Sequence, residues 1–583
     1  MARAFTHLAS LAAITICTTA NAQDFRQSAP KVPQPTVPVV TPPDVPFDGT
    51  DDSTPVISEL KGLRFIVDPA DADAASSPGL HVAQDLKPLL AREFQALAND
   101  AIGKPASLAS LNKLARSAVL AYRQAGHPLV DVAIVAQDVS DGIVSIVVRE
   151  FLVGSVAVEG NKHFATDLLR RYIRLEPGDQ VDQPALVDDL NLLSQNPFRR
   201  VDLIYRRGEA PLTTDVVVRV IDRHPLRVYA SYENNGVVAT GRDRWSAGFN
   251  WGNVFGGDGQ FAYQFTASSD GLFRSTNGLD SRFRAHSFTF VQPVNRSNNF
   301  IVFGTYQRTR PDLGPNFTLT GENYQLSPRF TFPVFGNAER RGQLSIGYDF
   351  KRTNNNLLFG GLDVSDEATE VHQAVIDLTL SQRWSLGLFS SSVTGFFSPG
   401  GIGSRNTDAA FQPGVDQIGT PFARAQYAYV RAIVTQTTPI GSKGFEAITR
   451  VTGQAATSNL LPTEQLAAAG PGLVRSYDPN SVLGSQGVLF TQEFWWPQFS
   501  PFGSKNPVES ARIGAFFDAG MVGNARRLPG EARWVRTTSA GVVARYNLGP
   551  YLEIRGDYGL QMRRQPGRDR LGSVGFISIT TGF

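Results

Sequence analysis

ARIGAFFDAGM, residues 511–521, is the stretch of sequence that decides the fold. Its odd positions are all apolar, whereas its even positions are mixed and include Arg512 and Asp518. Side chains alternate between two faces along a β-strand, so one face of this strand would contact lipid while Asp518 faces the opposite side. A segment of about ten alternating residues has the length of a transmembrane β-strand. The stretch therefore predicts a barrel strand with Asp518 in the lumen.

The same alternation runs through residues 225–583, in about sixteen segments, and an even number is usual for bacterial barrels. A soluble β-sandwich would also alternate, although over fewer strands. The chain contains no stretch near the roughly 20 apolar residues that a membrane helix needs. We therefore expect a mainly β protein with a 16-stranded transmembrane barrel, interrupted by one long loop at residues 456–486.

Two shorter modules precede the predicted barrel, at residues 56–150 and 151–224. Apolar residues are spaced by three or four in the expected helices of each module and by two in the expected strands. This spacing predicts the order strand, helix, helix, strand, strand. Ser107 is placed to cap the second helix of the first module. Two modules of the same order in tandem form an internal repeat of small α+β domains.

The first 55 residues predict export followed by a tether. Residues 1–22 combine Arg3, an apolar run and a small-x-small end, which predicts a signal peptide cleaved between Ala22 and Gln23. The only cysteine, Cys17, leaves with that peptide, so the mature chain forms no disulfide. Residues 23–55 are rich in proline, which favours an extended, semi-rigid linker.

Composition and motifs argue against several classes of function. A net charge of +2 argues against nucleic acid as a partner. The seven histidines are scattered without metal-ligand spacing, and no Gly-x-Ser-x-Gly nucleophile motif is found. We expect neither an enzyme nor a bound metal or cofactor.

Two motifs carry a resemblance to a known family. Val474-Arg475-Ser476-Tyr477 resembles the Val-Arg-Gly-Tyr/Phe tip of the long sixth extracellular loop in the outer-membrane transporters of two-partner secretion. Phe516-Phe517-Asp518-Ala519-Gly520 resembles the Phe-x-Asp-x-Gly pattern of that family's thirteenth strand. The whole mature chain is similar to this family, called TpsB, of the haemolysin-activator and filamentous-haemagglutinin-secretor type, and the two modules look like its paired POTRA domains.

The resemblance implies that the long loop folds into the lumen, where Arg475 meets Asp518 and locks the loop to the barrel. Such a pair is reasonable physically, because each charge is costly alone in a partly dehydrated lumen. Ser476 departs from the family pattern, since it stands where glycine usually does and cannot adopt a positive φ as cheaply. Residues 23–30 show no pattern of the helix that plugs the lumen in some members.

The implied function is ATP-independent secretion of a partner exoprotein, an adhesin or haemolysin-like protein, across the outer membrane of a Gram-negative bacterium. Periplasmic POTRA domains would capture the unfolded exoprotein, and lipid would surround the barrel. The terminal Phe583 resembles the signal by which the barrel assembly machinery recognises its clients. A barrel-assembly insertase of the same superfamily is the alternative, and a passive porin is a more distant one.

Overall fold

The computed structural model describes residues 29–33, 39–40, 52–74, 77–273, 281–311, 317–336, 340–359, 362–413, 419–503 and 508–583. The predicted signal peptide, its cleavage site at Ala22 and Gln23, and residues 23–28, where a plug helix was not expected, lie outside this part of the chain. The chain divides into two compact units, and among described residues the first holds 39–223 and the second holds 29–33 and 224–583.

The first module of the first unit is a four-stranded sheet with two helices. The sheet has the order β4-β3-β7-β6. β3 is parallel to both β4 and β7, whereas β6 is antiparallel to β7. The strands are β3 (Gly62–Ile66), β4 (Gly79–Val82), β6 (Val130–Ala133) and β7 (Ile143–Glu150). The helices are α2 (Arg92–Ala101), α3 (Leu108–Gln124) and the 3-10 turns η2 (Pro69–Asp71) and η3 (Lys87–Leu90), and β2 (Pro55–Ile57) pairs with β5 (Ala106–Ser107).

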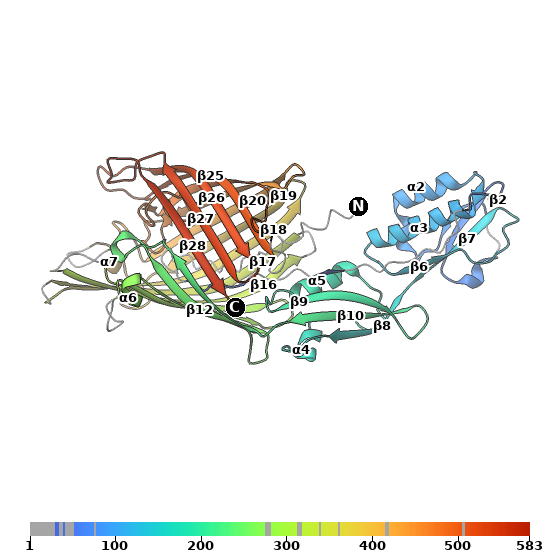
Figure 1. Ribbon diagram of the computed structural model, residues 1–583, viewed down its shortest axis with the longest axis horizontal. Coiled ribbons are helices and arrows are strands. Elements are labelled where there is room, and N and C mark those ends of the chain that lie inside the picture. The colour runs from blue at the N-terminus through green and yellow to red at the C-terminus, as the bar shows by residue number, and fades with distance from the viewer. Residues whose placement is uncertain are drawn as a thin grey trace. The chain divides into compact units, whose positions relative to one another are not determined.

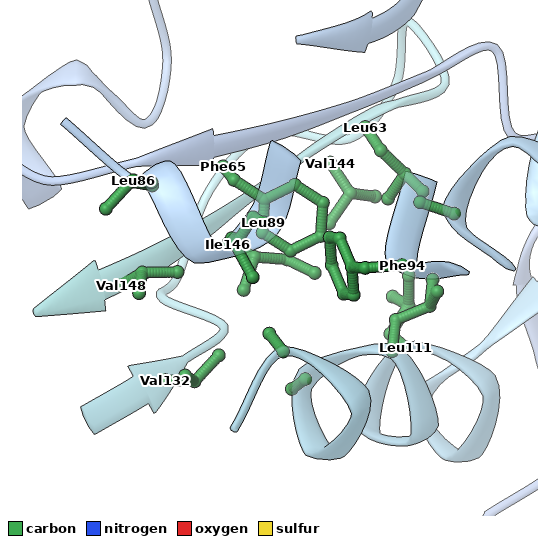
Figure 2. Close-up of a cluster of buried hydrophobic side chains, with 14 of the residues drawn as sticks. Leu63, Phe65, Leu86, Leu89, Phe94, Leu111, Val132, Val144, Ile146 and Val148 are labelled. Atoms are coloured by element: carbon green, nitrogen blue, oxygen red, sulfur yellow. The ribbon is translucent and has the colours of Figure 1, made fainter. Parts of the chain in front are cut away.

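An apolar core holds these helices against the sheet (Figure 2). Phe65 of β3 meets Phe94 of α2 edge-on, with ring centroids 5.2 Å apart, and Leu111 of α3 lies beside Phe94. Helix α3 begins where predicted, because the Ser107 side chain accepts a hydrogen bond from the Ser110 backbone and a reciprocal bond completes a capping box.

The second module repeats the α+β order. Its elements are β8 (Leu152–Glu159), α4 (Thr166–Arg170), α5 (Gln183–Leu193), β9 (Arg199–Arg207) and β10 (Thr213–Asp222). The sheet order is β1-β9-β10-β8, in which β1 is Val39–Val40 from the proline-rich segment. That segment is therefore not only a spacer, since two of its residues add a parallel edge to β9. No helix in the described part of the chain is long and apolar enough to cross a membrane.

The second unit is a closed barrel of sixteen strands, as predicted (Figure 1). The strands in order are β11 (Leu226–Glu233), β12 (Arg244–Val254), β13 (Gly259–Ala267), β14 (Phe283–Pro293), β15 (Asn299–Thr309), β16 (Phe317–Gly336), β17 (Arg340–Phe359), β18 (Leu362–Trp384), β19 (Gly387–Pro399), β20 (Gln426–Ile440), β21 (Phe445–Ala456), β24 (Gln486–Trp495), β25 (Glu509–Gly523), β26 (Val535–Leu548), β27 (Leu552–Gln561) and β28 (Ser573–Gly582). Short helical segments η4 (Val238–Thr240), α6 (Ser269–Phe273) and α7 (Asp408–Phe411) lie in its loops. β11 pairs with β28, which closes the ring.

Alternation along the strands separates an apolar outer face from a polar lumen. On β25, Ile513 and Phe517 are 49% and 40% exposed on the outer face, whereas Asp518 is fully buried on the inner one. This alternation is typical of a barrel that faces lipid outside and polar groups inside.

The chain between β21 and β24 folds back into the lumen instead of remaining outside. We call residues 457–485 the inward loop; it contains the short strand pair β22 (Leu466–Ala467) and β23 (Leu483–Gly484). Its own side chains Val474, Tyr477 and Val482 pack with Leu489 of β24 and Val522 of β25. Its apolar core thus continues onto the barrel wall.

Candidate functional site

Arg475, near the tip of the inward loop, is 1% exposed and binds two carboxylates of the barrel wall. Its Nε and Nη2 atoms donate to the two oxygens of Asp518, both at 2.7 Å, so this pair is bidentate. Nη1 donates to Oε1 of Glu493 at 2.7 Å. The backbone N–H of Arg475 also donates to Asp518 at 3.1 Å. We call these three residues the Arg475 cluster.

The two carboxylates of the wall lie on adjacent strands and both face the lumen. Asp518 lies on the lumen face of β25, and Glu493 lies on the lumen face of β24 opposite Phe516. The Phe516 ring lies beneath the guanidinium, whose central carbon is 3.6 Å from the ring centroid. Trp495 donates to the second oxygen of Glu493 at 3.0 Å. The guanidinium is thus enclosed by two anions and one aromatic face, which compensates its removal from water.

The motif residues around Arg475 have distinct environments. Val474 is fully buried and packs against Gly520, where an added Cβ would approach its Cγ2 to 2.8 Å. The Tyr477 hydroxyl accepts from the backbone N–H of Thr538 and lies 2.7 Å from the Arg563 carbonyl oxygen. Phe517 instead points outward and takes no part in the cluster.

Ser476 adopts the conformation that glycine would favour. Its φ is +75°, its side chain is fully buried, and its hydroxyl lacks a hydrogen-bond partner among described residues. A left-handed conformation costs an L-residue about 1–2 kcal/mol. Gly559 of β27 makes room for the serine, since a Cβ there would lie 2.2 Å from its Oγ.

A second buried ion cluster holds the loop to other strands and had no sequence signal. Glu464 of the inward loop is fully buried, and its carboxylate accepts from Lys351 Nζ at 2.7 Å, from the Tyr429 hydroxyl at 2.8 Å and from Gln373 Nε2 at 3.1 Å. These partners lie on β17, β20 and β18. We call this set the Glu464 cluster. Gln373 also donates to Asp349 at 3.0 Å, which extends the network along the wall.

Charged residues also bridge the closing junction between β11 and β28. Asp478 of the inward loop pairs with Arg242 at 2.6 Å and with Arg568 at 2.5 Å, which lie in the hairpin loops on either side of that junction. From the N-terminal segment, Lys31 pairs with Glu233 of β11 at 2.6 Å and donates to Thr580 of β28 at 3.0 Å. Sequence reasoning missed these contacts because they join segments far apart in the chain.

The comparisons with known proteins agree with this architecture. The family described as "Haemolysin secretion/activation protein ShlB/FhaC/HecB" matches residues 213–544, more than half of the chain. The chain belongs to this family. The ShlB-type POTRA domain matches residues 82–150. Members of the ShlB/FhaC/HecB family are outer-membrane transporters of partner exoproteins, with POTRA domains in the periplasm, so the predicted class and location are confirmed.

Solved structures share the fold at low sequence identity. CdiB from Escherichia coli is 14% identical, with a TM-score of 0.67 over 97% of this chain and 96% of that one. CdiB from Acinetobacter baumannii is 15% identical, with a TM-score of 0.56 over the same shares. BamA from Haemophilus ducreyi lacking POTRA domains 1–3 is 14% identical, with a TM-score of 0.52 over 90% of this chain and 100% of that one. No curated protein sequence matches the chain.

The last residue of the chain lies beside the first strand of the barrel. Phe583 follows β28, and its backbone exchanges hydrogen bonds with Val228 of β11 while its ring is 77% exposed. Among the described residues, no three or more His, Cys, Asp or Glu side chains are grouped to hold a metal ion.

Proposed function

We propose that the inward loop keeps the transporter closed at rest and that secretion requires its release from the Arg475 cluster. The observation that supports this is the burial of Arg475 between Asp518 and Glu493. A buried ion pair is stable only while its geometry is complete, so a small displacement of the loop leaves charges uncompensated. The cluster therefore favours two arrangements, a docked loop and a released one.

The first unit is proposed to capture the unfolded exoprotein before transport. In the first module, β4 and β6 each form an edge of the sheet. An extended peptide can add to such an edge through main-chain hydrogen bonds, with side-chain pockets supplying selectivity. This mode suits a client that must stay unfolded until it has crossed the membrane.

Other partners follow from the outer surface and the end of the chain. The apolar outer face of the barrel is proposed to contact outer-membrane lipid, and Phe583 to serve the barrel assembly machinery during biogenesis. The client is proposed to be an adhesin or haemolysin-like exoprotein that crosses without ATP. The proposed domain limits are 1–22 for the signal peptide, 23–55 for the proline-rich linker, 56–150 and 151–224 for the two POTRA domains, and 225–583 for the barrel.

A charge-reversal experiment tests the lock. The variants Arg475→Asp and Asp518→Arg are each expected to reduce secretion of the exoprotein. The first places a third carboxylate beside Asp518 and Glu493, and the second places a second guanidinium group beside Arg475. The double variant restores one opposite-charge pair and is expected to recover part of the loss. Normal secretion by Arg475→Ala, with the barrel folded as judged by heat-dependent gel mobility, would contradict the proposal.

A further inference from the structure

Three arginines lie side by side on the lumen wall of the last strands. Arg512 of β25 is directly opposite Arg545 of β26, which is directly opposite Arg555 of β27. We call these three residues the arginine rung. They share the face of Asp518, Thr537 and Gln561, whose side chains bind the inward loop. Like charges directly opposite each other destabilise a sheet, so the arrangement costs the barrel stability.

Among the described residues, two members of the rung form no ion pair. Arg512 pairs with Glu446 at 2.8 Å. In the part of the chain that the structure describes, no carboxylate oxygen lies within 4.0 Å of a guanidinium nitrogen of Arg545 or Arg555. Glu553 and Asp557 share the lumen face of β27 with Arg555, two positions before and after it, and still leave it unpaired.

The aromatic ring of Trp495 lies beside two arginines of the rung. The guanidinium carbons of Arg545 and Arg512 lie 4.7 Å and 5.6 Å from the Trp495 ring. Trp495 is 2% exposed and packs in a small core with Phe516 and Val543. The Nε atom of Arg545 is buried without a hydrogen-bond partner among described residues. Packing thus holds Arg545 in place while part of its donor capacity is unused.

The rung lies on the side of the lock from which a client arrives. β25 begins at the same end of the barrel as β11, which continues from the periplasmic domains. Arg512 precedes Asp518 by six residues, so along the strand the rung is about 20 Å nearer the periplasm. A chain entering the lumen passes the rung before it reaches the Arg475 cluster.

We propose that the arginine rung binds carboxylate side chains of an acidic, extended segment of the exoprotein as that segment enters the lumen. This inference rests on the proposed transport function and adds the chemistry of the segment. Guanidinium groups bind carboxylates through paired, charge-assisted hydrogen bonds, and directly opposite residues on adjacent strands lie about 5 Å apart, so neighbouring members of the rung can bind one carboxylate together. Such binding would also neutralise the repulsion within the rung.

Peptide binding to the purified full-length protein in detergent tests the proposal directly. The probes are an oligoglutamate, an oligoglutamine and an oligolysine of equal length, followed by fluorescence anisotropy at low and high KCl. Oligoglutamate is expected to bind most tightly and to weaken with added salt. The double variant Arg545→Gln, Arg555→Gln is expected to bind it at least about tenfold more weakly. Arg545→Lys, Arg555→Lys keeps the charge and should lose less.

Arg450→Gln is the matched control, since Arg450 lies on the lumen face of β21 opposite two threonines, Thr435 and Thr491. It is expected to change oligoglutamate binding less than about twofold. Thermal unfolding of Arg555→Gln should show an unchanged or raised midpoint, because repulsion is relieved. Equal binding of the three peptides, or equal loss in Arg450→Gln and the double variant, overturns the inference. Secretion can persist in either case, so the transport proposal is judged separately.

Discussion

The two ion clusters that hold the inward loop have opposite polarity. In the Arg475 cluster the loop supplies a cation to two carboxylates of β24 and β25. In the Glu464 cluster the loop supplies an anion to an ammonium, an amide and a hydroxyl of β17, β18 and β20. β20 of the Glu464 cluster and β24 of the Arg475 cluster are separated by β21 alone in the ring of sixteen, so the two clusters lie on neighbouring parts of the wall. The loop is therefore anchored to the wall at two separate places, through Glu464 and through Arg475.

The difference between the clusters lies in what remains when the loop leaves. Departure of Arg475 leaves two carboxylates on adjacent strands, and Arg545 compensates Glu493 only through a longer-range attraction. Departure of Glu464 leaves Lys351 near Asp349, two positions away on the same face of β17, which also pairs with Arg329, so part of the Lys351 charge stays compensated. We infer that the Arg475 cluster contributes the larger share of the free energy that docks the loop.

The largest expected effect belongs to Arg475→Met, which leaves both carboxylates unpaired. Removing one partner of a buried ion pair costs about 3–5 kcal/mol. A cysteine placed at the buried Ala469 of the loop, in a Cys17→Ser background, reports loop release through its rate of thiol labelling. We expect Arg475→Met to speed labelling by more than about a hundredfold, since each 1.4 kcal/mol is a factor of ten. An unchanged rate would show that the cluster does not hold the loop.

Glu464→Gln is the counterpart in the other cluster and should have a smaller effect. The amide keeps an acceptor for Lys351 and Tyr429 but loses the charge, for an expected cost of about 1–3 kcal/mol. The same labelling assay measures it. A larger acceleration than that of Arg475→Met would reverse the inferred ranking of the two clusters.

Sequence reasoning reached one cluster and not the other for a physical reason. Alternation on β25 places Asp518 in the lumen whatever the loop does, and a motif resemblance supplies Arg475 as its partner. Alternation on β24 also places Glu493 on the lumen face, yet no feature of the local sequence shows that one arginine binds a second carboxylate. The contact between Glu464 and Lys351 joins residues 113 positions apart and depends on the path of the whole loop.

Backbone conformation marks a second limit of the sequence. The departure from glycine at Ser476 was visible, but its consequence was not, because a serine could have shifted the tip to a negative φ. The structure keeps the left-handed conformation and accommodates the side chain against Gly559. Compensation of this kind depends on a strand 83 positions later in the chain, which only tertiary packing brings near.

Gly559→Ala tests that compensation with a moderate expected effect. The new Cβ would lie 2.2 Å from Ser476 Oγ and 2.7 Å from Phe516 Cζ, so the tip must shift at a cost of about 1–3 kcal/mol. Gly556→Ala on the same strand is the control, because its Cβ meets nothing nearer than 3.9 Å. Labelling should accelerate only in the first variant. Adding Ser476→Gly should recover part of that change, and simple additivity of the two substitutions would argue against direct contact.

Ser476→Gly alone has the smallest expected effect and the opposite sign. Glycine removes a left-handed serine, worth about 1–2 kcal/mol, and a buried hydroxyl without a partner. The greater freedom of glycine in the released loop offsets about 0.5–1 kcal/mol of that gain. The net expectation is a tighter dock by about 1 kcal/mol and a labelling rate about fivefold slower. Faster labelling would mean that the serine contributes to docking, and that its left-handed backbone conformation does not destabilise the docked loop.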